Sequence, residues 1–538
     1  MILWIMYVTA VPNRTSPPAI LIRESYREGD TVKVRTIANI TKWPKRRIEL
    51  LKKLLRGDLD ETVPGDEAPR QGKAIGALFA LREMAKRTGL DGVLGKTEKG
   101  RRALLLIFAR LMIQGSRLRA VRWAEEEAIE ETLGIGRVSE DDLYEVLDWL
   151  SENEEKIEKK LFNARHETPP SLFLYDVTSS YLEGAQNELA DYGYNRDRKK
   201  GKKQIVIGLL ADPHGDPVAV RVGEGNTGDP ATVEEQIRTL TQSFGVTEVI
   251  LVGDRGMLKA PQITSLPDGF RYITAITKPQ IRTLLEKGIL QMELFEDSLA
   301  EVVHEGVRYI VRRNPVRQKE IEQAREAKLS RIRAFLSEKN IYLADHGKAD
   351  PAIAARDITA RIVHLKMDTW AKAVREERAL SLAIDEEARA EAAALDGCYV
   401  IKSDVPHERA DTETLHARYK DLASVERDFR DMKTAHLEVR PVYVRKKERT
   451  KGHVFVVMLA LLLKRHMERL LHASYGEGRP AASEVLTSLD RLCCQERDVE
   501  GIPVRYIPIP DERQSGYLAA LGVTLPKKLV SLKRAHVR

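Results

Sequence analysis

The first 57 residues alternate between β-branched runs and a basic amphipathic segment. The runs AILIRESY and TVKVRTI flank the turn REGD, which predicts a β-hairpin over residues 19–37. A helix is expected next, because Pro44 suits a first turn and apolar residues recur at helical spacing from Ile48 to Leu55 before Gly57. The opposite face of this helix is basic, so it is either a solvated surface or a contact for DNA phosphates. That face carries Lys45, Arg46, Lys52, Lys53 and Arg56.

Residues 58–73 are polar and rich in Pro and Gly, which predicts a linker. Helices follow over residues 74–165. The break QGS predicts a tight turn between two of them, with Ser116 as the N-cap of the second. Arg117, Arg119 and Arg122 on that second helix fit a DNA-reading helix-turn-helix, although any helical bundle contains such joints.

From residue 171 the pattern changes to short apolar runs broken by Gly, Pro and Asp. The runs are SLFLYDVTSSYLEG, KQIVIGLLAD, PVAVRVGEG and TEVILVGDRG, with a helix-like TVEEQIRTLTQSF before the last. This order of strand, strand, strand, helix and strand indicates a mixed sheet with covering helices, which is an α/β fold.

The pattern changes again between residues 279 and 395. Here the hairpin sequence EVVHEGVRYIVRR precedes a highly charged helix and a strand-rich stretch, so we interpret the segment as an insertion. Strand character returns at GCYVIKS, followed by the helix LHARYKDLASVERDFRDMK and an apolar helix that runs to about residue 470. The tail from about residue 476 carries no recognisable motif.

The length of 538 residues predicts about two to four domains. The 88 Lys and Arg exceed the 81 Asp and Glu by too little to identify a nucleic-acid-binding protein, but the basic residues are clustered. The clusters are KWPKRRIELLKKLLR, RDRKKGKK and RKKERTK. Three cysteines without C-x-x-C spacing argue against a disulfide framework and against structural zinc, and favour an intracellular protein.

No segment is predicted to cross a membrane. The N-terminal MILWIMYV lacks a basic flank, and the run Val454–Leu463 is much shorter than the roughly 20 apolar residues that a span needs. This second run is better interpreted as a buried core helix. The sequence therefore favours a soluble, cytoplasmic protein.

Two aspartates occupy positions where functional carboxylates are common. Asp176 follows LFLY within a predicted strand, and Asp254 follows VILVG at the end of another. A carboxylate in or at the lip of a buried strand is unfavourable unless it is paired or binds a cation. Either residue alone is equally explained as a turn Asp at a strand end, so the assignment needs a third partner.

Glu426 is the third candidate. The buried face of its predicted helix is marked at helical spacing by Leu422, Val425, Phe429 and Met432. A spacing of seven residues drifts only about 20° around a helix, so Tyr419, Glu426 and Lys433 form one stripe that borders this face.

This stripe resembles the signature Y-(2)-R-(3)-E-(6)-K of one branch of the DDE transposases of bacterial insertion sequences. Tyr419, Glu426 and Lys433 match its spacing, and Leu422 stands where the signature has Arg. The resemblance extends from about residue 20 to about residue 470, through DVTSSYLEG, GYNRD, KQIVIGL, GNTGD and VGDRGM in the family's order. Each element is weak alone, but the ordered set is specific.

The resemblance implies a ribonuclease-H-like catalytic core that an insertion domain interrupts between Asp254 and Glu426. The stretch between these two residues is more than twice as long as that between Asp176 and Asp254, which agrees with an insertion. The expected domains, which include a largely helical N-terminal DNA-binding region, are 1–57 (hairpin and basic helix), 74–165 (helical DNA-binding region), 166–278 (first part of the catalytic core), 279–395 (insertion domain), 396–475 (second part of the core) and 476–538 (C-terminal tail).

The resemblance also implies that Asp176, Asp254 and Glu426 are catalytic and hold two Mg²⁺ ions, for which Mn²⁺ can substitute. Carboxylate oxygens are the hard donors that Mg²⁺ prefers, and a pair of such ions activates the attacking water or 3′-hydroxyl and stabilises the leaving oxygen. The expected reaction is DNA cleavage at the element ends and transfer of the 3′-hydroxyl into target DNA. The expected partners are terminal inverted repeats and target DNA, bound by a dimer.

Further contacts to DNA phosphates are expected from two helices. Arg430 and Lys433 lie within one or two turns of Glu426, and Arg430 can take the role of the absent signature Arg. The DNA-binding candidates are Tyr419, Arg430, Lys433, Lys45, Arg46, Lys52 and Lys53.

Two other recombination classes fit poorly. A tyrosine recombinase would use His466 and Arg469 with Tyr506, but the first two continue the apolar helix, and a relaxase would need a His-x-His pair that the sequence lacks. The alternative that stays open is a transposase-derived DNA-binding protein that no longer cuts DNA. Leu422 leaves room for it, whereas the three carboxylates favour the enzyme.

Overall fold

The structure, a computed structural model, describes residues 5–13, 17–29, 31–56, 70–184, 186–197, 199–433, 437–440, 443–499 and 502–526. For some residues inside helices and strands, Arg46 among them, the side chain is outside this description. The chain divides into two compact units, one formed by residues up to Phe79 and from Ser488 onward, the other by Ala80–Thr487.

The N-terminal part of the first unit is an antiparallel sheet with a helix. The strands are β1 (Ile5–Val11), β2 (Ala19–Glu28) and β3 (Thr31–Asn39), in the order β1-β2-β3. The hairpin predicted over residues 19–37 is confirmed by the pairing of β2 with β3. Helix α1 (Lys45–Arg56) contacts β1, and the burial of Ile48 confirms its apolar face.

A second antiparallel sheet of this unit joins distant parts of the chain. Its strands are β4 (Arg70–Ala74), β15 (Cys493–Val499) and β16 (Ile502–Tyr506), in the order β16-β15-β4, and α17 (Glu512–Ala520) follows them. The end of the predicted linker 58–73 is therefore a strand, while its residues 58–69 lie outside the described part of the chain. The tail from residue 476 supplies the partner strands, a long-range pairing that no local pattern signals.

The centre of the second unit is an eight-stranded mixed sheet of order β10-β11-β14-β9-β8-β5-β6-β7. The strands are β5 (Leu172–Tyr181), β6 (Gln204–Ala211), β7 (Pro217–Gly223), β8 (Val249–Gly253), β9 (Phe270–Ala275), β10 (Ala300–His304), β11 (Val307–Arg313) and β14 (Cys398–Ser403). The pairs β5–β8 and β8–β9 are parallel and the other pairs are antiparallel. The predicted mixed α/β architecture is confirmed.

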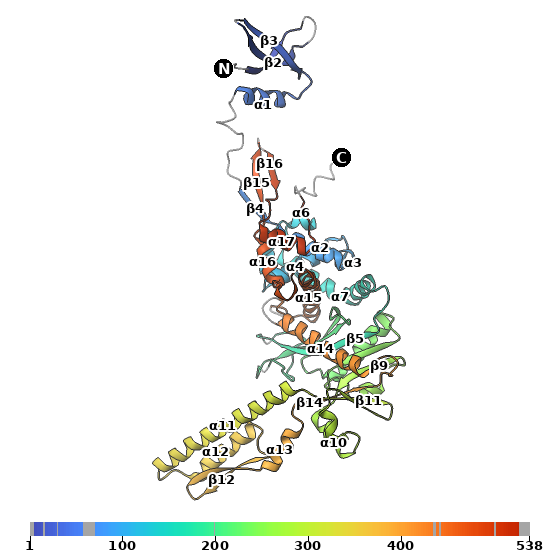
Figure 1. Cartoon of the computed structure of the whole chain (residues 1–538), viewed down its shortest axis with the longest axis vertical. Helices are drawn as coiled ribbons and strands as arrows, with labels where there is room; N and C mark the ends of the chain where they lie inside the picture. The colour runs from blue at the N-terminus through green and yellow to red at the C-terminus, as the bar shows by residue number, and fades with distance from the viewer. Residues whose placement is uncertain are drawn as a thin grey trace. The chain divides into compact units, whose positions relative to one another are not determined.

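Helices pack on this sheet (Figure 1). The helices concerned are α7 (Glu140–Arg165), α8 (Asp229–Arg238), the π-helical turn Thr239–Ser243, α9 (Ala260–Thr264), α14 (Thr412–Lys433) and α15 (Lys447–Tyr475). One face of β5, with Phe173, Tyr175 and Val177, packs in a core that includes Phe162 of α7 and Val233 of α8. Because side chains alternate along a strand, Asp176 belongs to the opposite face. Helix α14 contacts β5, β8 and β9.

Several helices precede the sheet, and one of them, Glu98–Met112, packs on α15. They are α2 (Gly76–Arg87), α3 (Leu90–Leu94), α4 (Glu98–Met112), α5 (Arg117–Glu126) and α6 (Ile129–Leu133), with α16 (Ala482–Asp490) after α15 and a short 3-10 turn, Gly476–Gly478. The predicted Ser116 N-cap is confirmed, since its side chain accepts a hydrogen bond from Arg119 N–H. A Cβ at Gly452 would lie 2.1 Å from the carbonyl oxygen of Leu147, so α15 and α7 touch backbone to backbone.

The apolar run Val454–Leu463 lies in α15 and is buried throughout, which confirms its interpretation as a core helix. In the described part of the chain, no helix has the length and apolarity needed to cross a membrane.

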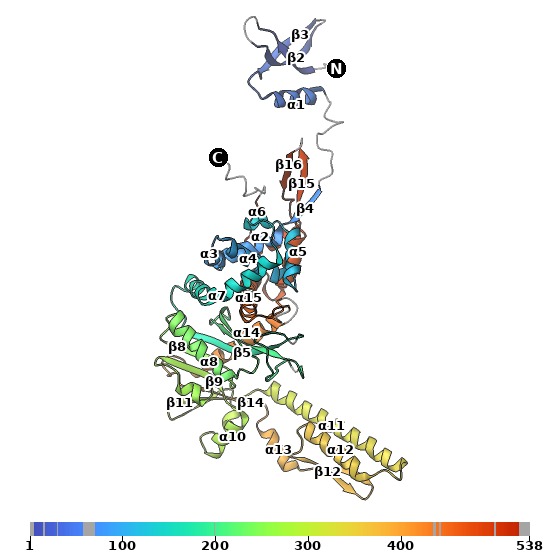
Figure 2. The same cartoon turned by 180° about the vertical axis from the view of Figure 1, so that it is seen from behind.

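Between β11 and β14, which pair directly, the chain leaves the sheet and builds a separate core. This segment comprises α11 (Pro315–Asp345), α12 (Pro351–His364), β12 (Ala371–Glu376), β13 (Ala379–Ile384) and α13 (Glu386–Ala394). Figure 2 shows α11 alongside α12, and Leu329, Ile358 and Trp370 are among the residues buried between these elements.

The separate core is smaller than the predicted segment 279–395. The first part of that segment, with α10 (Lys278–Glu286), the 3-10 turn Met292–Phe295 and β10, instead packs at the edge of the large sheet through β11.

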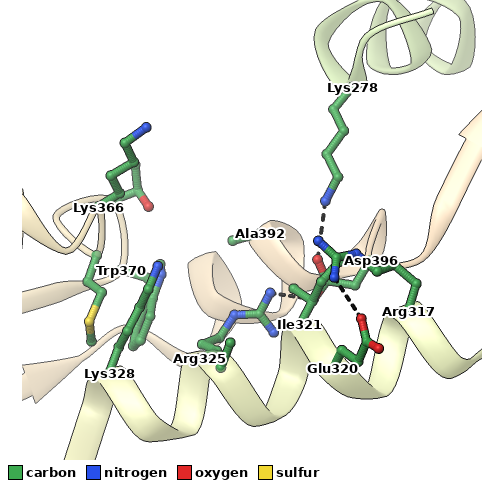
Figure 3. Close-up of a pocket in the computed structure, with 13 residues that line it drawn as sticks. Lys278, Arg317, Glu320, Ile321, Arg325, Lys328, Lys366, Trp370, Ala392 and Asp396 are labelled. Atoms are coloured by element: carbon green, nitrogen blue, oxygen red, sulfur yellow. Dashed lines mark hydrogen bonds and ion pairs between the residues drawn. The ribbon is translucent and has the colours of Figure 1, made fainter. Parts of the chain in front are cut away.

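A buried carboxylate joins this separate core to the sheet. Asp396 is paired with Lys278 of α10 (3.2 Å) and with Arg325 of α11 (Figure 3). These residues line a cavity of about 340 Å³, whose wall also includes the buried Trp370. None of the candidate site residues lines it, so this cavity is separate from the candidate active site.

Another buried ion cluster joins α7 to the sheet. Arg221 of β7 donates to Glu158 (2.8 Å), to Glu154 (3.2 Å) and to the hydroxyl of Thr239 (3.0 Å), and Glu158 also accepts from Val220 N–H (3.0 Å). The pKa of Glu154 is raised to about 8, mainly by burial and also by the neighbouring carboxylate of Glu158. One arginine thus faces two buried carboxylates.

This cluster makes stability depend on pH. The pKa of the Glu154 carboxyl is higher in the folded than in the unfolded protein. The contribution of this carboxyl to folding stability is therefore complete below its pKa in the unfolded chain, and it is lost as the pH rises through about 8. Glu154→Gln is therefore expected to be more stable than the wild type at pH 8.5, by about 1–3 kcal/mol, and to lose this advantage towards pH 5. The measurement is the urea unfolding midpoint at both pH values.

The matched control is Glu152→Gln, an exposed carboxylate on the same helix, which is expected to change stability by less than about 0.5 kcal/mol at either pH. An advantage of Glu154→Gln that was equal at pH 5 and pH 8.5 would contradict the explanation.

Candidate active site

Asp176 lies in the middle of β5, and its Oδ1 accepts a hydrogen bond from Val177 N–H (2.8 Å). The pKa of Asp176 is raised to about 7, mainly by burial and also by the carboxylates of Asp254 and Glu426, although the hydrogen bond from Val177 N–H lowers it. A cation beside these carboxylates would favour their ionised forms.

Asp254 directly follows β8 and stands level with Asp176. The parallel register pairs Tyr175 with Gly253, so the residue that follows each of these two in the chain is an aspartate. Oδ1 of Asp254 accepts from Arg255 N–H (2.7 Å), and its carbonyl oxygen accepts from Met257 N–H (3.0 Å), which forms the turn that leaves the strand. The sheet thus presents two carboxylates on neighbouring strands.

Glu426 is exposed on α14, the helix that contacts both strands. The predicted apolar face of this helix is confirmed, because Leu422, Val425, Phe429 and Met432 are all buried. Leu422, which takes the place of the signature Arg, is only 4% exposed and so extends this apolar face. The carboxylate of Glu426 is close enough to Asp176 in β5 to raise the pKa of that aspartate.

Tyr419, two turns before Glu426, is half-buried among the same groups. Burial raises the pKa of its phenol, and the carboxylates of Asp254, Glu426 and Asp176 raise it as well. The tyrosine hydroxyl therefore stays protonated at neutral pH and can donate a hydrogen bond. Four of the residues predicted from the sequence are thus within electrostatic reach of one another.

These carboxylates are not arranged as a finished metal centre. Among the residues that the structure describes, no three His, Cys, Asp or Glu side chains are positioned to hold one metal ion together. The chain brings the acidic residues onto adjoining elements, and metal coordination would require their side chains to turn towards a shared ion.

Lys433, predicted to bind DNA, is paired with Asp197, at 2.8 Å between Nζ and Oδ1. Asp197 also accepts a hydrogen bond from Tyr181 N–H (3.2 Å), so it joins the end of α14 to the end of β5. The sequence analysis did not single out Asp197, although it belongs to the quoted segment GYNRD. Arg430 is exposed on the same helix.

The basic face of α1 lies in the other compact unit. Lys45 and Lys53 are exposed, and Lys52 pairs with Glu49 at 2.8 Å. The side chain of Arg46, which is also predicted to bind DNA, is outside the described part of the structure.

The idea that Arg117 faces DNA is wrong. Arg117 is 1% exposed, it approaches Nδ1 of His453 on α15 at 3.3 Å, and its guanidinium lies over the ring of Tyr144. It therefore links α5 to the helices around it. Arg119 and Arg122 are exposed. The helical period shows which residues share a face, but which face the neighbouring helices cover depends on tertiary packing.

Comparison with known sequences identifies the class. The sequence model of the family described as "Transposase DDE domain" matches residues 167–463, more than half of the chain. The chain therefore belongs to the DDE transposases, metal-dependent DNA-cleaving enzymes that generally use divalent metal ions. A second model, "IS1634 family transposase, N-terminal domain", matches residues 8–65 and indicates a transposase of a bacterial insertion sequence. The predicted class is confirmed.

No curated protein matches the chain significantly. A solved structure described as "Cryo-EM structure of piggyBac transposase synaptic complex with hairpin DNA (SNHP)" is similar with a TM-score of 0.34 and 10% sequence identity, over 77% of this chain and 78% of that chain. This structural likeness is too low to carry an argument, so the assignment depends on the sequence models.

Proposed function

We propose that this transposase cuts DNA at the ends of its element and joins the freed 3′-hydroxyl to target DNA, with Asp176, Asp254 and Glu426 as metal ligands. The observation that supports this most is the parallel register of β5 and β8, which sets the two aspartates level beside a helix that carries the glutamate. We propose two Mg²⁺ ions as the natural cofactor, with Mn²⁺ as a substitute.

The chemistry of the donor set fits such ions. Asp176, Asp254 and Glu426 offer only carboxylate oxygens, which are hard donors, and no thiolate or imidazole is part of the set. The mutual repulsion that contributes to the raised pKa of Asp176 is relieved when a divalent cation lies between the carboxylates. When bound, the ions would activate the attacking hydroxyl and stabilise the leaving oxygen of an in-line displacement.

The remaining side chains near the site would hold the DNA. The protonated hydroxyl of Tyr419 can donate to a phosphate oxygen close to the carboxylates. Arg430 can grip a phosphate with two parallel hydrogen bonds, which compensates for the apolar Leu422. Lys433 neutralises Asp197 and can contact a phosphate with the donors that remain on its ammonium group.

We further propose that the large sheet is a ribonuclease-H-like core, formed by residues 166–278 and 396–475 and interrupted by an insertion domain. The insertion would be centred on the separate core between β11 and β14. The N-terminal sheet and α1 would contact the inverted repeats, and a dimer would hold two ends together. The helices of residues 74–165 pack on the core, since α4 and α7 contact α15, and their exposed Arg119 and Arg122 would contact DNA as well.

The proposed function makes three predictions, of which the first concerns the acidic residues. Replacing Asp176, Asp254 or Glu426 by Ala is expected to reduce cleavage by more than the roughly 100-fold that loss of an outer-shell partner of a metal costs. Binding of the same DNA should change by less than about 2-fold, because phosphate contacts dominate affinity. The measurement is Mg²⁺-dependent nicking of a labelled duplex that carries the end of the element, with a mobility shift in EDTA for binding.

The matched control is Glu413→Ala, an exposed glutamate on the same helix, which should cut at the wild-type rate. A wild-type protein that bound this duplex but did not cut it with Mg²⁺ or Mn²⁺ would support the alternative of a DNA-binding protein without cleavage activity.

A second prediction concerns α1. The double substitution Lys45→Glu and Lys53→Glu is expected to weaken binding of the end duplex by about 10-fold or more and to reduce the salt slope of log affinity by about two units. The measurement is a titration at several salt concentrations. The control pair is Lys348→Glu and Lys372→Glu, exposed lysines of the separate core. An equal loss from both pairs would count against a contact by α1.

A third prediction compares two exposed arginines of α14. Arg430→Ala is expected to slow cleavage by about 10-fold or more, because a charged hydrogen bond to phosphate is lost, whereas Arg427 points about 100° away from Glu426 and its replacement should have little effect. Leu422→Arg is not expected to increase the cleavage rate above that of the wild type and should reduce stability, since it places a charge in the apolar face. Equal cleavage rates of the two Ala variants at the same salt would show that Arg430 has no such role.

A further inference from the structure

The connection between β5 and β6 exposes two aromatic rings. Tyr192 is 62% exposed and Tyr194 is 83% exposed. Both rings lie in the segment DYGYNRD, which none of the roles proposed above explains. Rings exposed to this extent leave most of their surface accessible to a ligand.

The backbone that carries these tyrosines is fixed. Asp191 and Gln204 exchange two backbone hydrogen bonds (3.1 and 2.9 Å), and the side chain of Gln204 donates to the carbonyl oxygens of Tyr194 (3.2 Å) and Gly225 (2.8 Å). A Cβ at Gly193 would lie 2.1 Å from the carbonyl oxygen of Gly225, so only glycine fits between the tyrosines. The backbone that carries the two exposed rings is thus ordered before any ligand binds, which lowers the entropy cost of binding.

Cationic side chains accompany both rings. The guanidinium of Arg196 lies 5.8 Å from the ring centre of Tyr194, and the ammonium of Lys203 lies 5.7 Å from that of Tyr192. Lys199 and Lys200 are exposed in the same connection. The nearby Asp197 is already paired with Lys433, so the surface is basic and would attract an anion.

The aromatic surface, defined by Tyr192, Tyr194, Arg196 and Lys203, adjoins the candidate active site. The N–H of Arg196 donates to the hydroxyl of Ser179 (3.0 Å), which is on the same strand as Asp176 but on its other face, and the adjacent Asp197 pairs with Lys433 of α14. The guanidinium of Arg196 also acts electrostatically on the carboxyl of Asp176. A strand of DNA at the carboxylates would therefore pass within reach of the two rings.

We propose that the aromatic surface binds unpaired DNA bases next to the bond that is cut, with Tyr192 and Tyr194 stacking on the bases and the surrounding cations holding the phosphates. Exposed rings interleaved with basic side chains suit single-stranded nucleic acid, since every base has a face to stack, whereas paired bases in a duplex hide these faces. This inference rests on the proposed function, because it takes DNA to be the substrate at the carboxylates.

The test measures binding of the full-length protein to a labelled oligothymidylate and to a fully paired duplex, in EDTA so that no cutting occurs. Tyr192→Ala and Tyr194→Ala are each expected to weaken oligothymidylate binding by about 5-fold or more, while duplex binding changes by less than about 2-fold. Tyr194→Phe should bind like the wild type, because the ring is kept. Both tyrosines are exposed, so the variants are expected to fold.

The matched control is Tyr342→Ala, which removes an exposed tyrosine from α11 and should leave both affinities unchanged. Wild-type affinity of the double tyrosine variant for oligothymidylate would overturn the proposal, and so would an equal loss for both DNA forms. Because binding is measured without a divalent ion, its failure is distinct from failure of the proposed function, which the Asp176→Ala cleavage assay reports.

Discussion

The parallel pairing of β5 with β8 is the constraint on which the candidate site depends. Backbone hydrogen bonds fix Tyr175 opposite Gly253, and a shift of one residue would send one aspartate to the other side of the sheet. Both strands are buried along their paired residues, so packing on both faces supports this register. The helix α14 then needs only its apolar face, which includes the unusual Leu422, to bring Tyr419 and Glu426 over the same two strands.

Features that depend on residues close together in the chain could be predicted from the sequence. The β2–β3 hairpin, the Ser116 cap and the buried face of α14 each follow from spacings within one element. The grouping of Asp176, Asp254 and Glu426 was predicted through the family resemblance, since nothing in the spacing of residues so far apart states that they meet. The domain match confirms the class, whereas the roles of the three residues stay predictions.

The features that could not be predicted arise from contacts between distant segments. The pairing of β11 with β14 makes the β10–β11 hairpin part of the large sheet. The separate core is therefore smaller than the predicted insertion 279–395. The β4–β15 pairing gives the C-terminal tail a structural role. Arg117 is buried because helices from other parts of the chain cover it, and a charged residue looks the same in sequence whether it is solvated or packed on a tyrosine ring.

Asp197 shows why the surroundings of a site matter as much as its ligands. Its carboxylate takes a hydrogen bond from the backbone of β5 and an ion pair from the end of α14, and it follows directly after Arg196. Three elements that carry candidate functional groups therefore meet at one side chain. Because Asp197 and Lys433 are each only about one-fifth exposed, this pair is less screened by solvent than a surface ion pair. Removing Asp197 would leave Lys433 without its partner and release the aromatic surface from the helix that carries Glu426, so the positions of the acidic residues and of the basic, aromatic connection are linked through this carboxylate.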